Sequence, residues 1–508
     1  MLDTELRRAR AALRGIAAAA ALILVGGAAW GEEPAAAQYP TDAQGWSEAA
    51  ARDINAAYAV FLENHPGVYD KDNPHFREQL AAARQESLEL ARQVRDDSGY
   101  HFALMRFTAM LSDGHAVVFP IVKSASPKPK WPGFAAVWRG DGLYVAVSEV
   151  EGIAGGARVV SCDGVPVKDV IARNVFRFIG RAKEPGQWWT QAGAVFLDVG
   201  NPFVTPPKVC VFKSAGRTQS RALEWRPIDR EARNRLGKEV NGEAPTPGMT
   251  QPEPGITWIA MPTFGPDEEL QKTYRGAIKQ IVDQRDTFRA ARAIVIDLRG
   301  NGGGSSEWPA QLAEALWGKR LVDTMIDAYF KNVEVWWRAS PGNTAYVRDS
   351  IGDLKKQGFD DAAKQWTVIA KGMQDALDKG EKYYVEQQTN TPAGQLGPDV
   401  PPLTTPVYVI VSGRCASACL DALDMFTRFA NTKLIGAPSS ADSTYLETRR
   451  ETLPSKFAVV VIPNKVWVHR PRKSGEAYAP AITVTDLDWS TANFLAVVKR
   501  DLAERPHP

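Results

Sequence analysis

One stretch near the carboxyl end combines a buried strand, a sharp break and the start of a helix. Residues 407–411 read Val-Tyr-Val-Ile-Val, an apolar and mostly β-branched run that is typical of a buried strand. Residues 412–414 interrupt the run, and from Ala416 the apolar spacing favours a helix. Ser417 is therefore expected near a helix N-terminus, where free N–H groups suit a developing oxyanion. A serine that simply caps the helix fits the same pattern.

A second buried strand runs directly into a glycine-rich turn. Residues 294–298 read Ile-Val-Ile-Asp-Leu, and residues 299–305 read Arg-Gly-Asn-Gly-Gly-Gly-Ser. Glycines allow the backbone to approach a ligand closely and to turn its N–H groups inward. Neither the dinucleotide fingerprint nor the Lys-Ser/Thr ending of a P-loop is present, so the turn does not indicate nucleotide binding.

Together, the two stretches resemble the tail-specific (C-terminal processing) serine peptidase family. Residues 297–304 are similar to its Asp-x-Arg-x-Asn-x-Gly-Gly segment, and residues 407–418 to its nucleophile segment. The resemblance implies that Ser417 is the nucleophile and that the backbone N–H groups of Gly303 and Ala418 form the oxyanion hole. It also implies an α/β, multi-domain fold with a ClpP/crotonase-like, mostly parallel sheet covered by helices.

A histidine is the expected general base. Residues 113–115 read Asp-Gly-His and resemble the turn that carries the catalytic histidine in the tricorn-like branch of the family. A strand follows, so His115 is expected at a turn-to-strand edge that can hold it rigidly; an ordinary exposed histidine is the alternative. Members of the processing branch use a downstream lysine instead, but Asp442 stands at that position here, with no lysine between Lys433 and Lys456.

The remaining site positions are also expected from the resemblance. Residues 470–480 are similar to the late segment that carries the glutamate of the tricorn-like branch, which implies that Glu476 orients the histidine. The second serine of that branch is replaced by Gly114, and Ser112 is only nearby. Asp442 and His469 are reserve candidates for the orienting group and the base.

The chain of 508 residues is too long for one ordinary core. Strands and helices alternate in its second half, which indicates a mostly parallel sheet. The segment around Val159–Val167 resembles a PDZ domain, a module that binds peptides by strand addition. We expect a signal peptide (1–37), an N-terminal helical unit ending in the His115 turn (44–122), a PDZ-like β domain (133–227), a catalytic core (255–319 and 401–505) and a helical cap inserted near the active site (320–400).

The amino terminus has the pattern of a secretory signal. Arginines at positions 7, 8, 10 and 14 precede an apolar run over residues 16–29, and small residues follow. We therefore expect a periplasmic or secreted protein, with an uncleaved anchor as the alternative. No later stretch is apolar enough to span a membrane, and a net charge of +2 gives no indication of nucleic-acid binding.

The four cysteines fit an exported enzyme with few disulfides. Cys162 and Cys210 fall in strand-like sequence of one domain and are a plausible pair. Cys415 and Cys419 would share one face of a helix, away from Ser417, and are interpreted mainly as small core residues. No further ligands lie near them, so the sequence indicates no metal site and no cofactor.

These patterns predict an exported serine peptidase that hydrolyses peptides or unfolded proteins, with an acyl-enzyme on Ser417 and His115 as base. Two alternatives stay open: a non-catalytic peptide or apolar-ligand binding protein on the same fold, and an esterase-type hydrolase. A homo-oligomer is also left open by the sequence.

Overall fold

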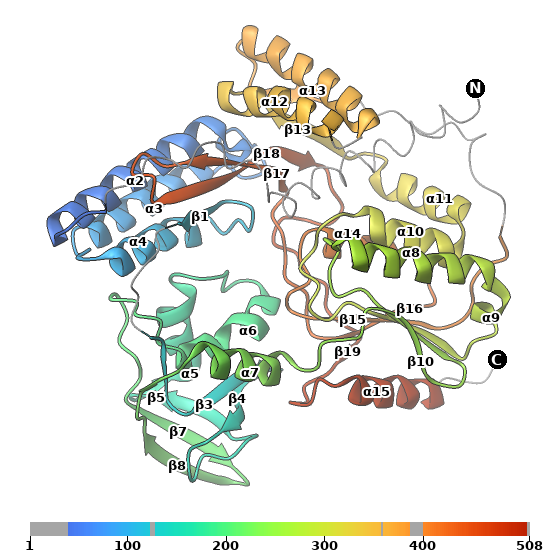
Figure 1. The fold of residues 1–508 in the computed structure, drawn as a ribbon, viewed down its shortest axis with the longest axis horizontal. Coiled ribbons are helices and arrows are strands. Elements are labelled where there is room, and N and C mark those ends of the chain that lie inside the picture. Colours follow the sequence, from blue (N-terminus) through green and yellow to red (C-terminus); the bar gives the residue numbers. More distant parts are fainter. Residues whose placement is uncertain (1–38, 122–127, 357–358, 387–399, 505–508) are drawn as a thin grey trace. The chain divides into compact units, whose positions relative to one another are not determined.

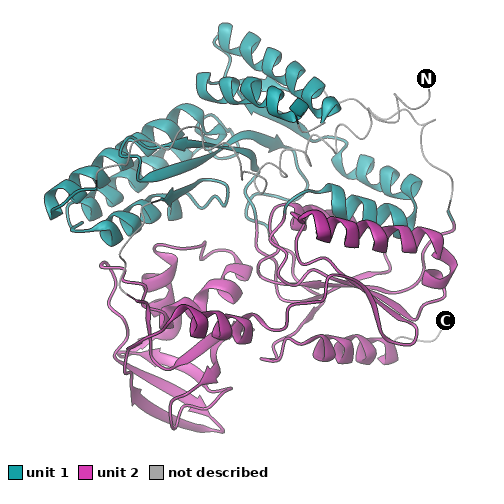
Figure 2. Ribbon diagram, viewed as in Figure 1, with its two compact units in different colours: residues 1–126, 304–400, 442–476 teal, residues 127–303, 401–441, 477–508 magenta. Residues whose placement is uncertain are grey.

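The computed structural model describes residues 39–121, 128–356, 359–386 and 400–504 (Figure 1). The expected signal peptide lies outside these residues. Within them, no helix has both the length and the apolar character that a membrane span requires. The chain forms two compact units, each assembled from separate segments (Figure 2). Unit 1 comprises residues 1–126, 304–400 and 442–476, and unit 2 comprises residues 127–303, 401–441 and 477–508.

The centre of unit 2 is a six-stranded sheet in the order β10-β11-β12-β15-β16-β19. Only the β10–β11 pair is antiparallel, which confirms the expected mostly parallel sheet. The central strands β12 and β15 have every residue buried, as their continuous apolar sequence predicts. The strands are β10 (Gly248–Glu253), β11 (Ile256–Ala260), β12 (Ala293–Asp297), β15 (Val407–Val411), β16 (Thr432–Gly436) and β19 (Ile482–Thr483).

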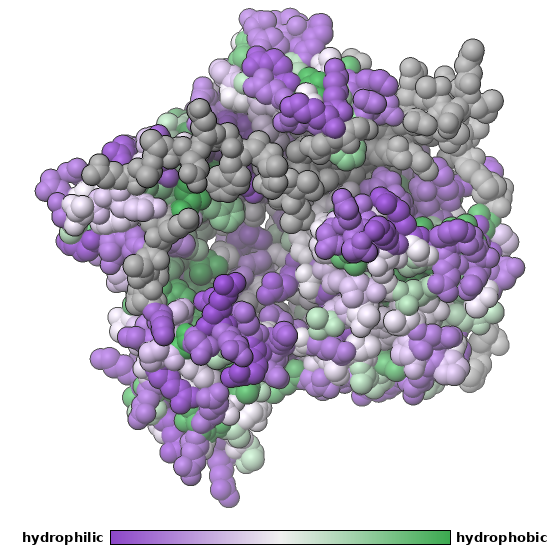
Figure 3. Space-filling model, viewed as in Figure 1, coloured by the Kyte–Doolittle hydropathy of each residue, from purple (hydrophilic) through white to green (hydrophobic). Residues whose placement is uncertain are grey.

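Helices cover both faces of this sheet. Helix α15 (Thr491–Glu504) packs Phe494, Val497 and Val498 against one face, while α8 and α14 lie over the other (Figure 1). The solvent-facing sides of α7 and α8 are hydrophilic (Figure 3). The other helices of this part are α7 (Arg230–Asn241), α8 (Glu268–Asp283), α9 (Arg285–Arg289) and α14 (Ala418–Phe426).

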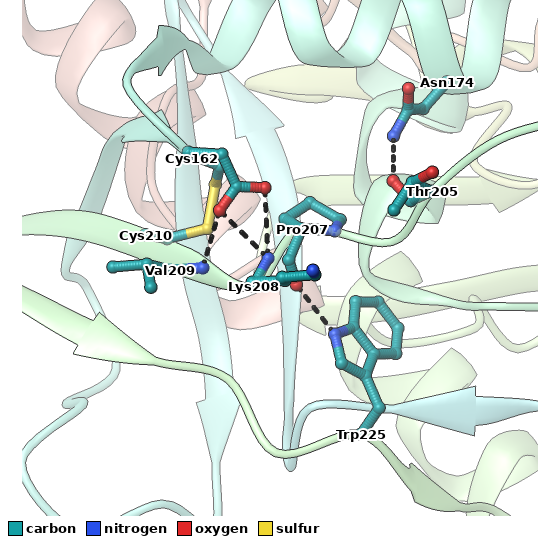
Figure 4. Close-up of a disulfide and its surroundings, with 9 residues drawn as sticks. Cys162, Asn174, Thr205, Pro207, Lys208, Val209, Cys210 and Trp225 are labelled. Atoms are coloured by element: carbon teal, nitrogen blue, oxygen red, sulfur yellow. Dashed lines mark hydrogen bonds between the residues drawn. A yellow bond between two sulfur atoms is a disulfide. The ribbon is translucent and has the colours of Figure 1, made fainter.

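Unit 2 also contains a β-rich module, residues 133–227, built on an antiparallel sheet in the order β3-β4-β5-β7-β8. Cys162 in β5 and Cys210 in β7, which the sequence offered as a plausible pair, form a disulfide between neighbouring strands (Figure 4). The elements from residue 130 to residue 227 are β2 (Lys130–Trp131), β3 (Phe134–Arg139), β4 (Gly142–Ser148), β5 (Arg158–Cys162), β6 (Val165–Pro166), α5 (Val167–Ile171), η2 (Ala172–Phe176), α6 (Pro185–Gln191), η3 (Ala192–Phe196), β7 (Val209–Ser214), β8 (Arg217–Ala222) and β9 (Arg226–Pro227).

Unit 1 begins with helices whose positions agree with the helical periodicity of the sequence. Helices α2 and α4 begin with the side chains of Asp42 and Asp96 accepting backbone N–H groups of the first turn. Phe61 and Phe107 meet in the core between these helices. The elements are α2 (Ala43–Asn64), η1 (Pro66–Val68), α3 (Phe76–Ala91) and α4 (Asp97–Ala109).

A second sheet belongs to unit 1, and its central strand corrects one prediction. The apolar run at residues 457–462 lies within the predicted catalytic core (401–505), for which a mostly parallel sheet is expected. It instead begins β18 (Ala458–Val468), which pairs antiparallel with β1 (Val117–Pro120), β13 (Glu334–Arg338) and β17 (Tyr445–Thr452). An apolar strand sequence specifies burial but not its partner, so the run carried no sign of this sheet.

Residues 319–385 contain strands as well as the expected helices. The helices are α11 (Lys319–Phe330), α12 (Pro341–Lys356) and α13 (Asp360–Asp378), preceded by α10 (Glu307–Trp317). Helices α12 and α13 enclose an apolar cluster around Trp337 and Trp366. Strands β13 and β14 (Tyr383–Val385) flank this helix pair and pair with each other, so the region is anchored in the sheet of unit 1.

Candidate active site

The two stretches that stood out in the sequence leave from one edge of the parallel sheet. Strands β12 and β15 are parallel neighbours, with Asp297 opposite Ile410. The carboxyl ends of parallel strands meet at the same edge, where ligands of open α/β sheets bind. The glycine turn after β12 and the Ser412–Ser417 turn after β15 therefore start side by side.

Ser417 occupies a strained position between strand and helix. Its φ of 54° and ψ of −128° lie in a region that L residues rarely adopt, a cost of about 1–3 kcal/mol that surrounding structure must offset. Helix α14 begins at Ala418, slightly later than expected, and the Ser417 side chain makes no capping hydrogen bond to this helix, all of whose residues are described. The capping interpretation of Ser417 is therefore wrong.

Gly303 lies against the Ser417 backbone. Its φ is 109°, and an ideal Cβ placed on it would lie 2.8 Å from the Ser417 Cβ and 3.2 Å from the Ala418 nitrogen. The same atom would be 2.7 Å from the Ala416 carbonyl oxygen. Only glycine fits such an approach without displacing the backbone. The structure thus brings together Gly303, Ser417 and Ala418.

The amide of Gly303 already has a partner. Its N–H donates to Oδ1 of Asn301 at 2.8 Å, while Nδ2 of Asn301 donates to the Met261 carbonyl at 2.8 Å. The second bond fixes the orientation of the amide group, because a carbonyl can only accept. Ala418 is the first residue of α14, so its N–H has no carbonyl within the helix to donate to.

Asp297 and Arg299 brace the glycine turn. The two side chains form a buried ion pair at 2.7 Å, and the Trp258 indole donates to the same carboxylate at 3.0 Å. Arg299 also donates to the Trp489 carbonyl at 2.7 Å, at the start of α15. These buried charges are fully engaged in holding the turn on the sheet, which gives them a structural role.

His115 and Glu476 lie in unit 1. The His115 backbone N–H donates to Oδ1 of Asp113 at 2.9 Å, and its side-chain Nδ1 is buried with no hydrogen-bond partner among the described residues. Glu476 is exposed, and its carboxylate accepts the Lys473 N–H at 2.8 Å within its own turn. Across the described ranges, no hydrogen bond joins His115 to Glu476.

A buried histidine–aspartate pair supports the His115 turn. Nδ1 of His65 accepts the Gly67 N–H at 2.9 Å, so the proton of the neutral ring is on Nε2, which donates to Oδ2 of Asp113 at 3.0 Å. Ser443 donates to the other oxygen of Asp113 at 2.6 Å. The sequence analysis missed His65, because a lone histidine after a helix carries no local signal.

The charge states of this pair follow from burial and hydrogen bonding. Burial lowers the pKa of His65, and Asp113 only partly opposes this effect. Burial alone would raise the pKa of Asp113, but the hydrogen bond from His65, the nearby imidazoles and Ser443 together hold it below its usual value. An ionised Asp113 that accepts several hydrogen bonds from a neutral His65 and its neighbours is the consistent state.

A second buried carboxylate lies on β17. The side chain of Glu447 is 3% exposed, its φ is 57°, and one of its oxygens lies 3.7 Å from Nζ of Lys465. Burial raises the pKa of Glu447 to about 7, although the charges of Lys465 and His115 lower it. Lys465 is itself buried and lies over the Trp337 ring.

The two reserve candidates differ in exposure. Asp442 is buried, whereas His469 is exposed.

The two cysteines that flank Ser417 are not simple core residues. Cys415 and Cys419 form a disulfide, which corrects their interpretation as unpaired core side chains. The expected helix started too early: with α14 beginning at Ala418, Cys415 belongs to the turn and can fold back onto the helix. The four cysteines of the chain are therefore all paired.

Ser417 lies at a strained strand-to-helix turn, with the Gly303 backbone and the Ala418 amide beside it, an arrangement that is typical of serine hydrolases on an α/β sheet. Residues 255–478 match the family described as Peptidase family S41. The chain thus carries a domain of the tail-specific (C-terminal processing) peptidase family and is a serine-type peptidase.

Solved structures share the fold at low sequence identity. Mature CPAF is 14% identical, with a TM-score of 0.56 over 90% of this chain and 97% of that chain. Mature CPAF complexed with lactacystin is 14% identical, with a TM-score of 0.53 over 90% of this chain and 98% of that chain. No curated protein matches the sequence. These likenesses establish the mixed α/β, multi-domain fold.

Proposed function

We propose that this chain is an exported serine peptidase that cleaves peptides or unfolded proteins through an acyl-enzyme on Ser417. The observation that carries the proposal is the placement of Ser417 at a strained turn, with Gly303 and Ala418 beside it. A serine hydroxyl held at such a turn can attack a carbonyl, and adjacent backbone N–H groups can stabilise the oxyanion that forms.

The proposed base is His115. A neutral imidazole takes the proton of the Ser417 hydroxyl as the Ser417 oxygen attacks the peptide carbonyl, and it then protonates the leaving amine. Water hydrolyses the acyl-enzyme by the same path in reverse. The observation that supports His115 is its backbone attachment to Asp113 together with a buried, unsatisfied Nδ1 within the described part of the chain, which leaves an imidazole nitrogen for a catalytic partner.

The proposed oxyanion hole is formed by the N–H groups of Gly303 and Ala418. The Ala418 N–H is available as a first-turn helix amide. The Gly303 N–H must be shared with, or released from, Oδ1 of Asn301 when the oxyanion forms. If the Gly303 N–H leaves Oδ1 of Asn301 and donates to the oxyanion, this donor stabilises the transition state and not the resting enzyme.

The orienting carboxylate has two candidates. Glu476 is the one implied by the family resemblance, but its carboxylate is exposed and engaged in its own turn. Glu447 is favoured by burial and by its electrostatic interaction with His115. We keep Glu476 as the proposed orienter, and comparison of the two amide variants distinguishes them.

Export is supported by the cysteine pairing. The four cysteines of the chain form Cys162–Cys210 and Cys415–Cys419, and such bonds persist in oxidising compartments. The β-rich module (residues 133–227) is the proposed PDZ-like substrate-docking element, because β8 is an edge strand that could accept an extended peptide.

The decisive experiment is labelling with a fluorophosphonate probe, followed by mass mapping of the modified residue. We expect a single adduct on Ser417, and no labelling or peptide hydrolysis by the Ser417→Ala variant. A folded wild-type protein that neither reacts with the probe nor cleaves an unfolded substrate would favour the binding-protein alternative. Turnover of simple esters without turnover of peptides would favour an esterase.

A further inference from the structure

We propose that the Cys415–Cys419 disulfide positions the nucleophile, so that the peptidase is fully active only in its disulfide-bonded form. The bridge closes a loop over residues 415–419, and this loop contains both Ser417 and Ala418. Ser417 is the proposed nucleophile and Ala418 supplies a proposed oxyanion donor. The inference thus rests on the proposed function and adds a redox requirement to the same site.

The backbone conformation of Ser417 must be held by the residues on both sides of it. Ser417 has a φ of 54° and a ψ of −128°, and a non-glycine residue stays in such a region only where its surroundings fix it on both sides. On one side, the Cys415 N–H donates to the Ser412 carbonyl at 3.0 Å. On the other, the Cys419 N–H donates to the Ala416 carbonyl at 3.0 Å. The disulfide joins these two flanks covalently.

The Cys415–Cys419 bridge acts locally more than on the stability of the whole fold. A disulfide stabilises a protein mainly by restricting the unfolded chain, and this effect grows with the length of the loop that it closes. Cys162 and Cys210 are separated by 48 positions, whereas Cys415 and Cys419 are separated by 4. The shorter bridge therefore contributes little to overall stability by this route, and its main effect is local, on the turn that carries Ser417.

The Ser417 turn tolerates little displacement. An ideal Cβ on Gly303 would already lie 2.8 Å from the Ser417 Cβ, so the turn and the glycine loop are in close contact. Cys415 and Cys419 are both 0% exposed. Two separate thiols need more room than one bonded pair, so reduction is expected to displace the turn and with it the Ser417 oxygen and the Ala418 N–H.

The redox step is a two-electron thiol–disulfide exchange. One thiolate of a dithiol reductant attacks a cysteine sulfur, and a mixed disulfide forms as the Cys415–Cys419 bond breaks. The second thiol of the reductant then displaces the remaining cysteine. The protein gains two electrons and two protons as two thiols, and the reductant leaves as a cyclic disulfide.

The test compares two double variants of the full chain. In Cys415→Ala/Cys419→Ala we expect the rate of fluorophosphonate labelling and kcat for a short peptide to fall on the order of 10²-fold, because small misplacements of reacting groups are costly. KM and the thermal unfolding midpoint should change little. In the matched control, Cys162→Ala/Cys210→Ala, we expect lower thermal stability with a labelling rate near that of the wild type.

A second measurement keeps the inference falsifiable if the first variant does not fold. The Cys162→Ala/Cys210→Ala protein, whose only disulfide is Cys415–Cys419, is treated with dithiothreitol, and reduced thiols are counted by alkylation and mass spectrometry. Labelling should fall in proportion to reduction, with unchanged far-UV circular dichroism, and should recover on reoxidation. Fully reduced, folded protein that labels at the oxidised rate would overturn the inference.

Failure of the proposed function has a different outcome. If oxidised wild-type protein is not labelled on Ser417 at all, the nucleophile assignment fails, and the bridge has no catalytic serine to position. If oxidised protein is labelled on Ser417 and the Cys415→Ala/Cys419→Ala variant is labelled equally fast, only the inference about the bridge fails.

Discussion

His65 donates from Nε2 to Oδ2 of Asp113 across 3.0 Å, in a site where both side chains are almost completely buried. The other oxygen of Asp113 accepts the backbone N–H of His115. A histidine at the end of α2 is thereby connected, through one carboxylate, to the turn that carries the proposed base. This connection predicts that His65 affects catalysis only by positioning the turn that carries His115.

Replacing His65 by alanine should therefore lower both stability and turnover. The buried, ionised carboxylate of Asp113 would lose the hydrogen bond that His65 donates, which costs about 1.5–3 kcal/mol of the free energy of unfolding. The His115 turn would also be held less firmly, so kcat should fall with little change in KM. Urea unfolding and steady-state kinetics measure the two effects. The matched control is His75→Ala, because the His75–Glu78 pair is exposed; equal losses in both variants would contradict the positioning role.

The pH dependence of stability should carry the signature of His65. Burial lowers the pKa of His65 below its ordinary value of 6.5, so below that pH the unfolded state binds more protons than the folded state. The contribution of neutral His65 to the free energy of unfolding is therefore fully present above pH 6.5. It decreases as the pH falls below 6.5 and toward the lower pKa of the folded state. In His65→Gln this decrease should be smaller. Identical pH profiles for the variant and the wild type would show that His65 does not titrate as argued.

Glu447 should contribute with the opposite sign. Burial raises the pKa of Glu447 from 4.5 to about 7, so within this range the folded state retains a proton that the unfolded state releases. The corresponding stabilisation is complete below pH 4.5 and is lost as the pH rises to about 7. Unfolding of Glu447→Gln followed from pH 5 to pH 8 should show a less negative slope than the wild type; an unchanged slope would refute the assignment.

Replacing Gly303 by alanine should severely impair catalysis. The added Cβ would lie 2.8 Å from the Ser417 Cβ, in a backbone conformation with φ of 109°. We expect kcat to fall on the order of 10²–10³-fold, as for loss of one oxyanion donor, with a smaller change in KM. Gly302→Ala is the control, because a Cβ there would lie 3.9 Å from its nearest neighbour, the Arg414 carbonyl oxygen. Equal activity of the two variants would remove Gly303 from the site.

The base and its orienting group can be assigned by a series of variants. His115→Ala should lower kcat on the order of 10³-fold or more, judged by triad deletions, and wild-type activity should fall on acidification because the neutral imidazole is required. Glu476→Gln should cost more than Glu447→Gln or Asp442→Ala. A larger loss in Glu447→Gln would transfer the orienting role to Glu447, and near-normal turnover of His115→Ala would return the lysine-dyad alternative.

The parts of the site that sequence reasoning predicted are local in sequence. β-branched residues predict a strand at 407–411, and glycines predict a turn after Asp297. The parallel pairing of β12 with β15 brings these two segments together. The sequence made Cys162 and Cys210 a plausible pair, since both fall in strand-like sequence of one domain, but the connectivity of the four cysteines required the structure.

The parts that it missed depend on partners distant in sequence or on the exact start of a helix. His65 and Asp113 lie in separate segments of the chain, and no local sequence pattern predicts the contact between them. The antiparallel pairing of strand β18 could not be read from the sequence, because a continuous apolar run predicts a buried strand but not its partner strand. The Cys415–Cys419 bond was missed because the helix was expected from Ala416, whereas it begins at Ala418.

The position of β18 has a consequence for how the protein is made. This strand joins β1, β13 and β17 in one sheet, and it is the last strand of that sheet in chain order. Strand β1 therefore has no partner strand until residues 458–468 have been produced. Strand pairing over such sequence distances is slow and leaves edges exposed to aggregation. A truncation that removes residues 458–468 should therefore prevent unit 1 from folding even when all of its N-terminal residues are present.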